Sequence, residues 1–146
     1  MAQVQPVPSG YTTVTPFLQV RDAQQALDFC KKAFAAEERY KMQGPDGKLV
    51  HAEISIGNSV IMLAQSMGSE ITTSSFYVYV ENCDSLFRRA VNAGAKTKME
   101  LRDAIWGDRC GTVSDPFGNT WTVATHREDV PADEIERRYK EEISKK

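Results

Sequence analysis

Hydrophobic and polar residues alternate along several short segments in the first half of the chain, a pattern typical of strands with one buried face. These segments are residues 13–20, 38–42, 50–56 and 59–64. Between the first two, apolar residues recur at helical spacing, which predicts an amphipathic helix from an N-cap at Asp22 to about Ala36. The first half is therefore expected to fold as strand, helix and three further strands, with residues 1–10 as an extended arm.

The same order of elements returns after a polar linker at residues 65–74. A strand pattern at residues 75–80 is followed by a helix that Asn82 caps and Gly94 ends, and by strand patterns at residues 96–101, 109–114 and 120–125. Asp115-Pro116-Phe117-Gly118 predicts a type I turn joining the last two strands as a hairpin. Because a shift of 60 residues aligns strand with strand and cap with cap, the sequence indicates two copies of one β-α-β-β-β module.

These elements predict an α+β fold in one domain that covers residues 1–146. Its parts are module one at about residues 11–65, module two at about residues 74–126, and a C-terminal helix at about residues 131–144. That helix carries a thin apolar seam of Ile135, Tyr139 and Ile143, which predicts packing on the body of the protein or on a second subunit. At 146 residues the chain is long enough to bury a substantial core.

Composition and charge narrow the class of partner. A net charge of −2, with basic residues dispersed among acidic ones, argues against nucleic acid or an anionic membrane as the main partner. No apolar run approaches the roughly 20 residues that span a bilayer. Cys30, Cys83 and Cys110 are odd in number and far apart, and the N-terminus lacks the pattern of a signal peptide, so we expect a cytoplasmic protein with reduced thiols.

Two motifs add a family resemblance to this pattern. The Asp115-Pro116-Phe117-Gly118-Asn119-Thr120-Trp121 hairpin and the Trp106-Gly107-Asp108-Arg109 segment before it, set in two β-α-β-β-β modules, resemble the vicinal oxygen chelate superfamily. This superfamily includes glyoxalase I, bleomycin-resistance proteins and extradiol dioxygenases, and the chain looks most similar to its PhnB-like branch. The resemblance implies two curved mixed sheets around a small-molecule cleft, commonly in a homodimer, and so predicts those features here.

The resemblance also indicates which residues would bind a metal ion if the chain held one. Metal-bearing members place His or Glu ligands at four strand positions that correspond here to Thr15, Met62, Ser75 and Thr122. A divalent transition ion needs about three or four deprotonated nitrogen, sulfur or carboxylate ligands. None of the four residues supplies one, so we expect the usual metal centre to be absent and predict no cofactor.

His51 and Glu53 are the strongest candidates for chemistry. They lie two residues apart on a strand, so they share a face with Cα atoms about 6.6 Å apart. The pair could bind a polar substrate, act as acid and base, or supply two ligands of a displaced metal site. Alternatively, the two side chains form a solvated or hydrogen-bonded pair without chemistry.

Aromatic residues mark a second group of candidates. Phe17, Tyr77 and Tyr79 lie on the polar sides of their strands, where they suit a planar or apolar ligand if those sides line a cavity, and otherwise form ordinary core. Trp106 lies in a loop from which its ring could cover a cleft. Arg109 could hold a carboxylate or phosphate group in a bidentate manner, or form a salt bridge to Asp108, Asp103 or a partner chain.

Two further residues are interpreted as structural. Trp121 alternates with Thr122 and is expected to face the helices as core, and His126 follows the last strand as a surface residue.

The first functional hypothesis is a metal-free protein that binds a small organic molecule in an aromatic-lined cleft, with no catalytic residue assigned. Its predicted ligand-binding residues are Phe17, His51, Glu53, Met62, Tyr77, Tyr79, Trp106, Arg109 and Thr122. The alternative is an enzyme, either a metal-dependent lyase or dioxygenase that uses His51 and Glu53, or a metal-independent acid–base catalyst. A third possibility is a subunit whose cleft holds the partner's N-terminal arm or C-terminal helix.

Overall fold

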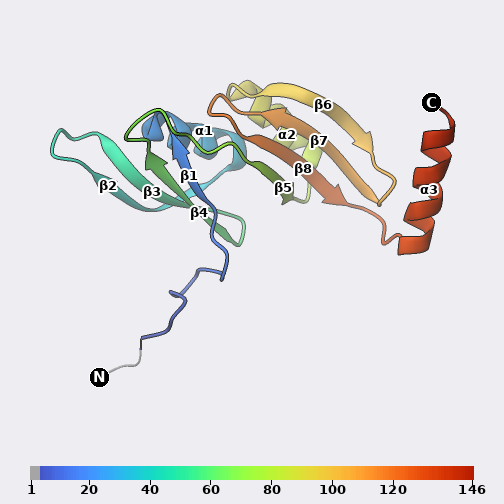
Figure 1. Cartoon of the computed structure of the whole chain (residues 1–146), viewed down its shortest axis with the longest axis horizontal. Helices are drawn as coiled ribbons and strands as arrows, with labels where there is room; N and C mark the ends of the chain where they lie inside the picture. The colour runs from blue at the N-terminus through green and yellow to red at the C-terminus, as the bar shows by residue number, and fades with distance from the viewer. Residues whose placement is uncertain (1–3) are drawn as a thin grey trace. The chain divides into compact units, whose positions relative to one another are not determined.

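The computed structural model describes residues 4–146, so the first three residues of the expected arm lie outside the described residues. The chain divides into two compact units, unit 1 up to Thr73 and unit 2 from Ser74. Each unit is one β-α-β-β-β module, as the colours of Figure 1 show along the chain. The chain passes from one unit to the other between Thr73 and Ser74, at the end of the polar segment 65–74.

Unit 1 folds as a four-stranded sheet covered on one face by a helix. Its elements in chain order are β1 (Phe17–Val20), α1 (Ala23–Phe34), β2 (Glu37–Gln43), β3 (Leu49–Ile56) and β4 (Ser59–Gln65). The strand order is β1-β4-β3-β2, with β1 parallel to β4 and the other pairs antiparallel.

The helix of unit 1 begins where the sequence predicts. The Asp22 side chain accepts a hydrogen bond from the backbone N–H of Gln25 at 3.0 Å, which satisfies one of the free donors of the first turn. The apolar face of α1, which includes Leu27 and Cys30, is buried with the inward residues of β3 such as Ile54. The opposite face of the sheet carries Glu53 and Met62, which are paired in the register of β3 and β4.

Unit 2 repeats this arrangement and adds a helix. Its elements are β5 (Ser75–Tyr79), α2 (Cys83–Asn92), β6 (Lys96–Asp103), β7 (Asp108–Ser114), β8 (Thr120–His126) and α3 (Ala132–Ser144). The strand order is β5-β8-β7-β6, with β5 parallel to β8, which is the order of unit 1. The α+β class, the duplicated module and the C-terminal helix predicted from the sequence are therefore confirmed.

The first strand begins later than its alternation suggests. β1 starts at Phe17 instead of residue 13. The Thr12 hydroxyl donates to the Val14 carbonyl and the Thr15 hydroxyl donates to the Thr12 carbonyl, so local bonds replace a strand ladder there. Pro16, which has no N–H to donate to a ladder, ends this segment.

The C-terminal helix α3 follows Pro131 and has no buried residue. Arg138 connects it to the rest of unit 2, because its guanidinium donates to the Ile105 carbonyl at 3.0 Å and to Glu128 at 3.0 Å. Tyr139 and Ile143 of the predicted seam remain exposed. The seam is thus not buried within this chain. Across residues 4–146, no helix is both long and apolar enough to cross a membrane.

Candidate functional site

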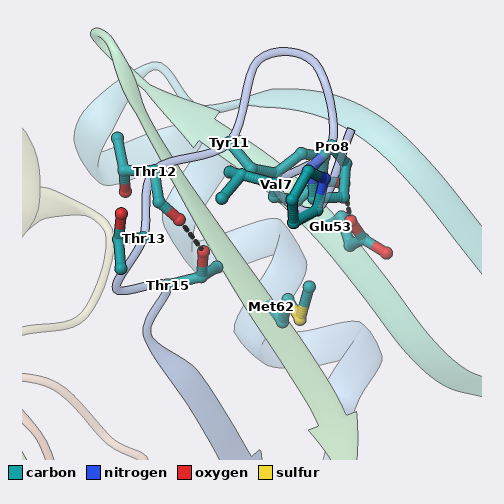
Figure 2. Close-up of a pocket in the computed structure, with 9 residues that line it drawn as sticks. Val7, Pro8, Tyr11, Thr12, Thr13, Thr15, Glu53 and Met62 are labelled. Atoms are coloured by element: carbon teal, nitrogen blue, oxygen red, sulfur yellow. Dashed lines mark hydrogen bonds between the residues drawn. The ribbon is translucent and has the colours of Figure 1, made fainter. Parts of the chain in front are cut away.

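A cavity of about 370 Å³ lies in unit 1 between the N-terminal segment and the open face of the sheet. Figure 2 shows the residues around it, which come from the arm and from β3 and β4. The lining residues are Pro6, Val7, Pro8, Tyr11, Thr12, Thr13, Thr15, Glu53 and Met62. The walls therefore combine apolar groups and hydroxyls with a single carboxylate.

Strand register brings the sheet residues of this cavity together. In β3, Ala52 and Ile54 are fully buried on the α1 side, so the alternation turns Glu53 to the opposite face. Glu53 is paired with Met62 of β4, and Met62 in turn with Phe17 of β1. Predicted ligand residues from three strands thus form one row across the sheet.

Glu53 is the polar centre of the cavity. Its side chain is only 13% exposed, and it accepts a hydrogen bond from the Tyr11 hydroxyl. The other carboxylate oxygen lies 3.1 Å from Nε2 of His51, so the predicted pair is hydrogen-bonded. The Arg39 guanidinium lies 5.4 Å from the centre of the Tyr11 ring, which adds a cation–π contact that holds the arm on the sheet.

Phe17 and His51 lie beside the cavity and do not line it. Their ring centres are 6.3 Å apart, and the Tyr40 ring lies 6.2 Å from His51 on the other side. These three rings form a partly exposed aromatic surface on the same face of the sheet.

In unit 2, the site residues gather around Asp108, whose side chain is 1% exposed. One carboxylate oxygen accepts hydrogen bonds from the hydroxyls of Tyr77 at 2.6 Å and Tyr79 at 3.1 Å and from Nε1 of Trp106 at 3.0 Å. The other oxygen lies 2.7 Å from Nδ1 of His126. Three aromatic residues predicted separately are therefore joined by one carboxylate.

Burial and hydrogen bonding act in opposite directions on Asp108. Burial favours the neutral acid, but the hydrogen bonds from Tyr77, His126, Tyr79 and Trp106 outweigh it and lower the pKa of Asp108. Burial and the hydrogen bond to this carboxylate raise the pKa values of Tyr77 and Tyr79. The cluster therefore holds one carboxylate anion and two neutral phenols at neutral pH.

His126 belongs to this cluster and is also exposed at the surface, as the sequence predicts. Its imidazole is 48% exposed and lies between two carboxylates, with Nδ1 facing Asp108 and Nε2 2.7 Å from Asp129. Hydrogen bonds to Asp108 and then to Asp129 raise the pKa of His126. An imidazolium satisfies this geometry because both of its nitrogens donate.

Thr122 lies on the same sheet face as Tyr77, its partner in the register of β5 and β8. Its hydroxyl is 2.7 Å from the hydroxyl of Thr112 on β7. Ser75 and Thr120 form a similar pair at 2.7 Å. The polar face of unit 2 therefore continues from the aromatic cluster into a group of paired hydroxyls.

Arg109 does not join these residues. It follows Asp108 in β7, so it points to the other face, where Nε and one Nη donate to the two oxygens of Asp84 at 2.8 and 3.0 Å. This bidentate pair lowers the pKa of Asp84 to about 2. The salt-bridge alternative from the sequence is present, with Asp84 of α2 as main partner and Asp103 as a weaker one at 3.5 Å.

The positions at which metal-bearing relatives place their ligands carry poor donors here. Thr15 and Met62 in unit 1 and Ser75 and Thr122 in unit 2 offer hydroxyls and a thioether. These donors do not fit a divalent transition ion. Within residues 4–146, no three His, Cys, Asp or Glu side chains are grouped so that they could hold a metal.

A comparison with known families decides the membership. The model of the Glyoxalase/Bleomycin resistance protein/Dioxygenase superfamily matches residues 10–123, which span both modules. The chain belongs to this superfamily.

Individual proteins resemble the chain to different degrees. An uncharacterized protein of Mycobacterium bovis is 39% identical over 135 residues, which cover 84% of this chain and 89% of the relative. The crystal structure of TioX from Micromonospora sp. ML1 is similar with a TM-score of 0.68 and 25% identity, covering 79% of this chain and 98% of that one. A Bacillus cereus structure described as a putative 3-demethylubiquinone-9 3-methyltransferase, PhnB protein, has a TM-score of 0.65 at 20% identity and covers 78% and 99%.

Proposed function

We propose that this member of the superfamily is a metal-free protein that binds a small organic molecule in the cavity of unit 1. The observation that carries the proposal is the cavity itself, which has a volume of about 370 Å³ and is lined in part by Thr15 and Met62. The family resemblance implies that metal-bearing members place ligands at these two positions. This volume lies within the range of about 300–1,000 Å³ in which ligand pockets fall.

The lining of the cavity defines the chemistry of the guest. Val7, Pro8 and Met62 offer apolar contact, and Thr13 and Thr15 offer hydroxyls. Glu53 supplies a largely buried hydrogen-bond acceptor, so the guest needs a hydroxyl, amide or amine group that can donate to it. A compact molecule with an apolar body and one donor group fits these walls.

The aromatic residues of unit 2 stay in this proposal as candidate ligand contacts on their own sheet face. Tyr77, Tyr79 and Trp106 keep their rings partly accessible while Asp108 holds their polar ends.

We also propose that the chain belongs to the PhnB-like branch. The support for this is the motif resemblance together with the similar fold of the Bacillus cereus structure.

A thermal-shift screen with metabolites and antibiotics tests the binding function. A molecule present at 100 times its Kd stabilises the folded chain by about 2.7 kcal/mol. For a chain of this size that raises Tm by roughly 5–10 °C. We expect Glu53→Gln to weaken binding of the molecules found, and the exposed Glu37→Gln variant to leave it unchanged. If Glu53→Gln and wild type bind these molecules with equal affinity, the cavity of unit 1 is not the binding site.

Elemental analysis of untagged protein separates the proposal from the metal-dependent lyase or dioxygenase. His51 and Glu53 provide only two donors, which already bond to each other at 3.1 Å. We expect less than stoichiometric metal after purification, and no shift of Tm when a chelator is added. A bound divalent ion that is lost in a His51→Ala variant would support the enzyme instead.

A further inference from the structure

A second, shallower hollow lies in unit 2, at the edge where the parallel strands β5 and β8 both end. It has a volume of about 570 Å³ and is lined by Tyr79, Val80, Glu81, Thr125 and His126. The Thr125 hydroxyl donates to the Val80 carbonyl and accepts from the backbone N–H of Cys83, both at 2.9 Å. One wall of the hollow is therefore fixed by hydrogen bonds between β8 and the start of α2.

His126 lines this hollow with an oriented imidazole. The buried carboxylate of Asp108 binds Nδ1 at 2.7 Å and is itself fixed by Tyr77, Tyr79 and Trp106. The ring is therefore held in one orientation, with Nε2 on the side away from Asp108. An imidazole supported in this way on one side serves as a hydrogen-bond donor on the other.

The protein's own Asp129 occupies the outward nitrogen. Its carboxylate lies 2.7 Å from Nε2, but its side chain is 100% exposed. An ion pair with a fully exposed partner contributes little to stability, because water screens the two charges. A carboxylate from a ligand can therefore replace Asp129 on His126 at small cost.

The other groups of the hollow select among carboxylates. Glu81 lines it with a negative charge, which disfavours a guest that is purely anionic and favours one that also carries a cation. The Tyr79 ring, 62% exposed and edge-on to His126 at 6.5 Å, offers an apolar surface. The hollow thus combines a cationic donor, an aromatic face and an acidic group.

We propose that this hollow is a second binding site, separate from the cavity of unit 1, for a small zwitterion of the aromatic amino acid class. The carboxylate of the ligand replaces Asp129 on Nε2 of His126. Its ammonium group faces Glu81, and its side chain lies on the Tyr79 ring.

Titration with L-phenylalanine at pH 6, followed by NMR of the histidine side chains, tests the site directly. The chain contains only two histidines, so a His126→Gln variant assigns both signals. We expect saturable shifts of the His126 signal and no change at His51. A His126 signal that does not move, or moves together with that of His51, overturns the proposal.

Three ligand forms and two exposed variants test each contact. N-acetylphenylalanine lacks the cation and phenylalanine amide lacks the carboxylate, so we expect each to bind at least about threefold more weakly than phenylalanine. Asp129→Asn removes the internal competitor and should tighten phenylalanine binding about two- to fivefold. Glu81→Gln should abolish the preference for phenylalanine over N-acetylphenylalanine. Unchanged affinity in Asp129→Asn, or equal binding of all three molecules, contradicts the proposal.

Discussion

Asp108 combines a buried charge with a complete set of partners. Four side chains donate to its two oxygens, and its backbone carbonyl accepts from the N–H of Ala104 at 2.7 Å. A buried carboxylate is stable only where such donors replace the water it has lost. Tyr77 and Trp106 both direct their polar atoms at Asp108, and Nε1 of Trp106 also donates to the Tyr77 hydroxyl at 3.0 Å.

We expect Asp108→Asn to destabilise the protein by about 3 kcal/mol. The amide nitrogen of Asn would face donors and leave part of the network unsatisfied, and breaking a buried charged pair typically costs about 3–5 kcal/mol. Urea denaturation measures the change. The control is Asp103→Asn, because the Asp103 side chain is 81% exposed and such a substitution stays within about 0.5 kcal/mol. Similar urea denaturation midpoints for the two variants would show that Asp108 stabilises the fold no more than an exposed carboxylate does.

The protonation of His126 is expected to make stability depend on pH. Its folded-state pKa is raised, first by Asp108 and then by Asp129, so charged His126 binds its proton more tightly in the folded chain. Its contribution is complete below the unfolded value of about 6.5 and is lost as the pH rises through the folded pKa. The stability of wild type relative to His126→Gln should therefore decline as the pH rises from about 6.5 through the folded pKa. A constant difference over that window would contradict this assignment.

Several site residues could be predicted from local pattern, and others could not. The shared face of His51 and Glu53 follows from the period of two in one strand, and the hydrogen bond between them agrees with it. Tyr11 contacts Glu53 across 42 residues, a separation that leaves no periodic signal. Asp108 lies one residue before the strand predicted at residues 109–114, so it was not assigned to a sheet face. If that strand is extended by one residue, Asp108 falls on the same face as Cys110 and therefore on the face of Tyr77.

At the scale of elements, Gly107 holds the loop before β7 against the segment after β8. Its carbonyl accepts from the backbone N–H groups of Arg127 at 3.0 Å and Glu128 at 3.1 Å. A Cβ atom there would lie 2.1 Å from the Glu128 carbonyl oxygen, and φ is +99°. The contact requires glycine because both space and backbone conformation exclude a side chain.

Gly107→Ala should therefore destabilise the fold by more than backbone strain alone would. We expect a loss of about 3 kcal/mol or more, since the 127–128 backbone must move as well as the loop. Gly47→Ala is the matched control. Gly47 also has a positive φ, of +79°, but has no neighbour within 4 Å of an added Cβ, so about 1–2 kcal/mol is expected. Thermal denaturation of both variants measures the difference, and equal losses would rule out the clash.

The sequence predicted the type of each element and the residues of the hairpin turn better than it predicted where the strands begin. The Asp115 carboxylate binds the N–H groups of Phe117 and Asn119 and Nε1 of Trp121, as expected for the turn residue of a hairpin. Trp121 is buried as predicted. The early start predicted for the first strand was wrong, because the hydroxyls of Thr12 and Thr15 bond the backbone locally.

At the scale of the whole molecule, the C-terminal helix α3 differs from α1 and α2 because none of its residues is buried. Ending the chain after Val130 removes α3, none of whose residues is buried, together with the Arg138 contacts to Ile105 and Glu128. Surface pairs of this kind contribute little, so we expect the stability of the shortened protein to stay within about 1 kcal/mol of the full chain. Chemical denaturation, with sedimentation velocity to record the oligomeric state, tests this. A large loss accompanied by dissociation would instead support the homodimer that the sequence predicts, with the Ile135, Tyr139 and Ile143 seam inside it.

The repeat also has a consequence for how the polypeptide is put together. Within the described residues, every strand of the first sheet comes from residues 17–65 and every strand of the second from residues 75–126. A cut between Thr73 and Ser74 therefore severs a covalent connection without opening either sheet. We expect separately expressed halves to retain the strand pairings of their own sheets.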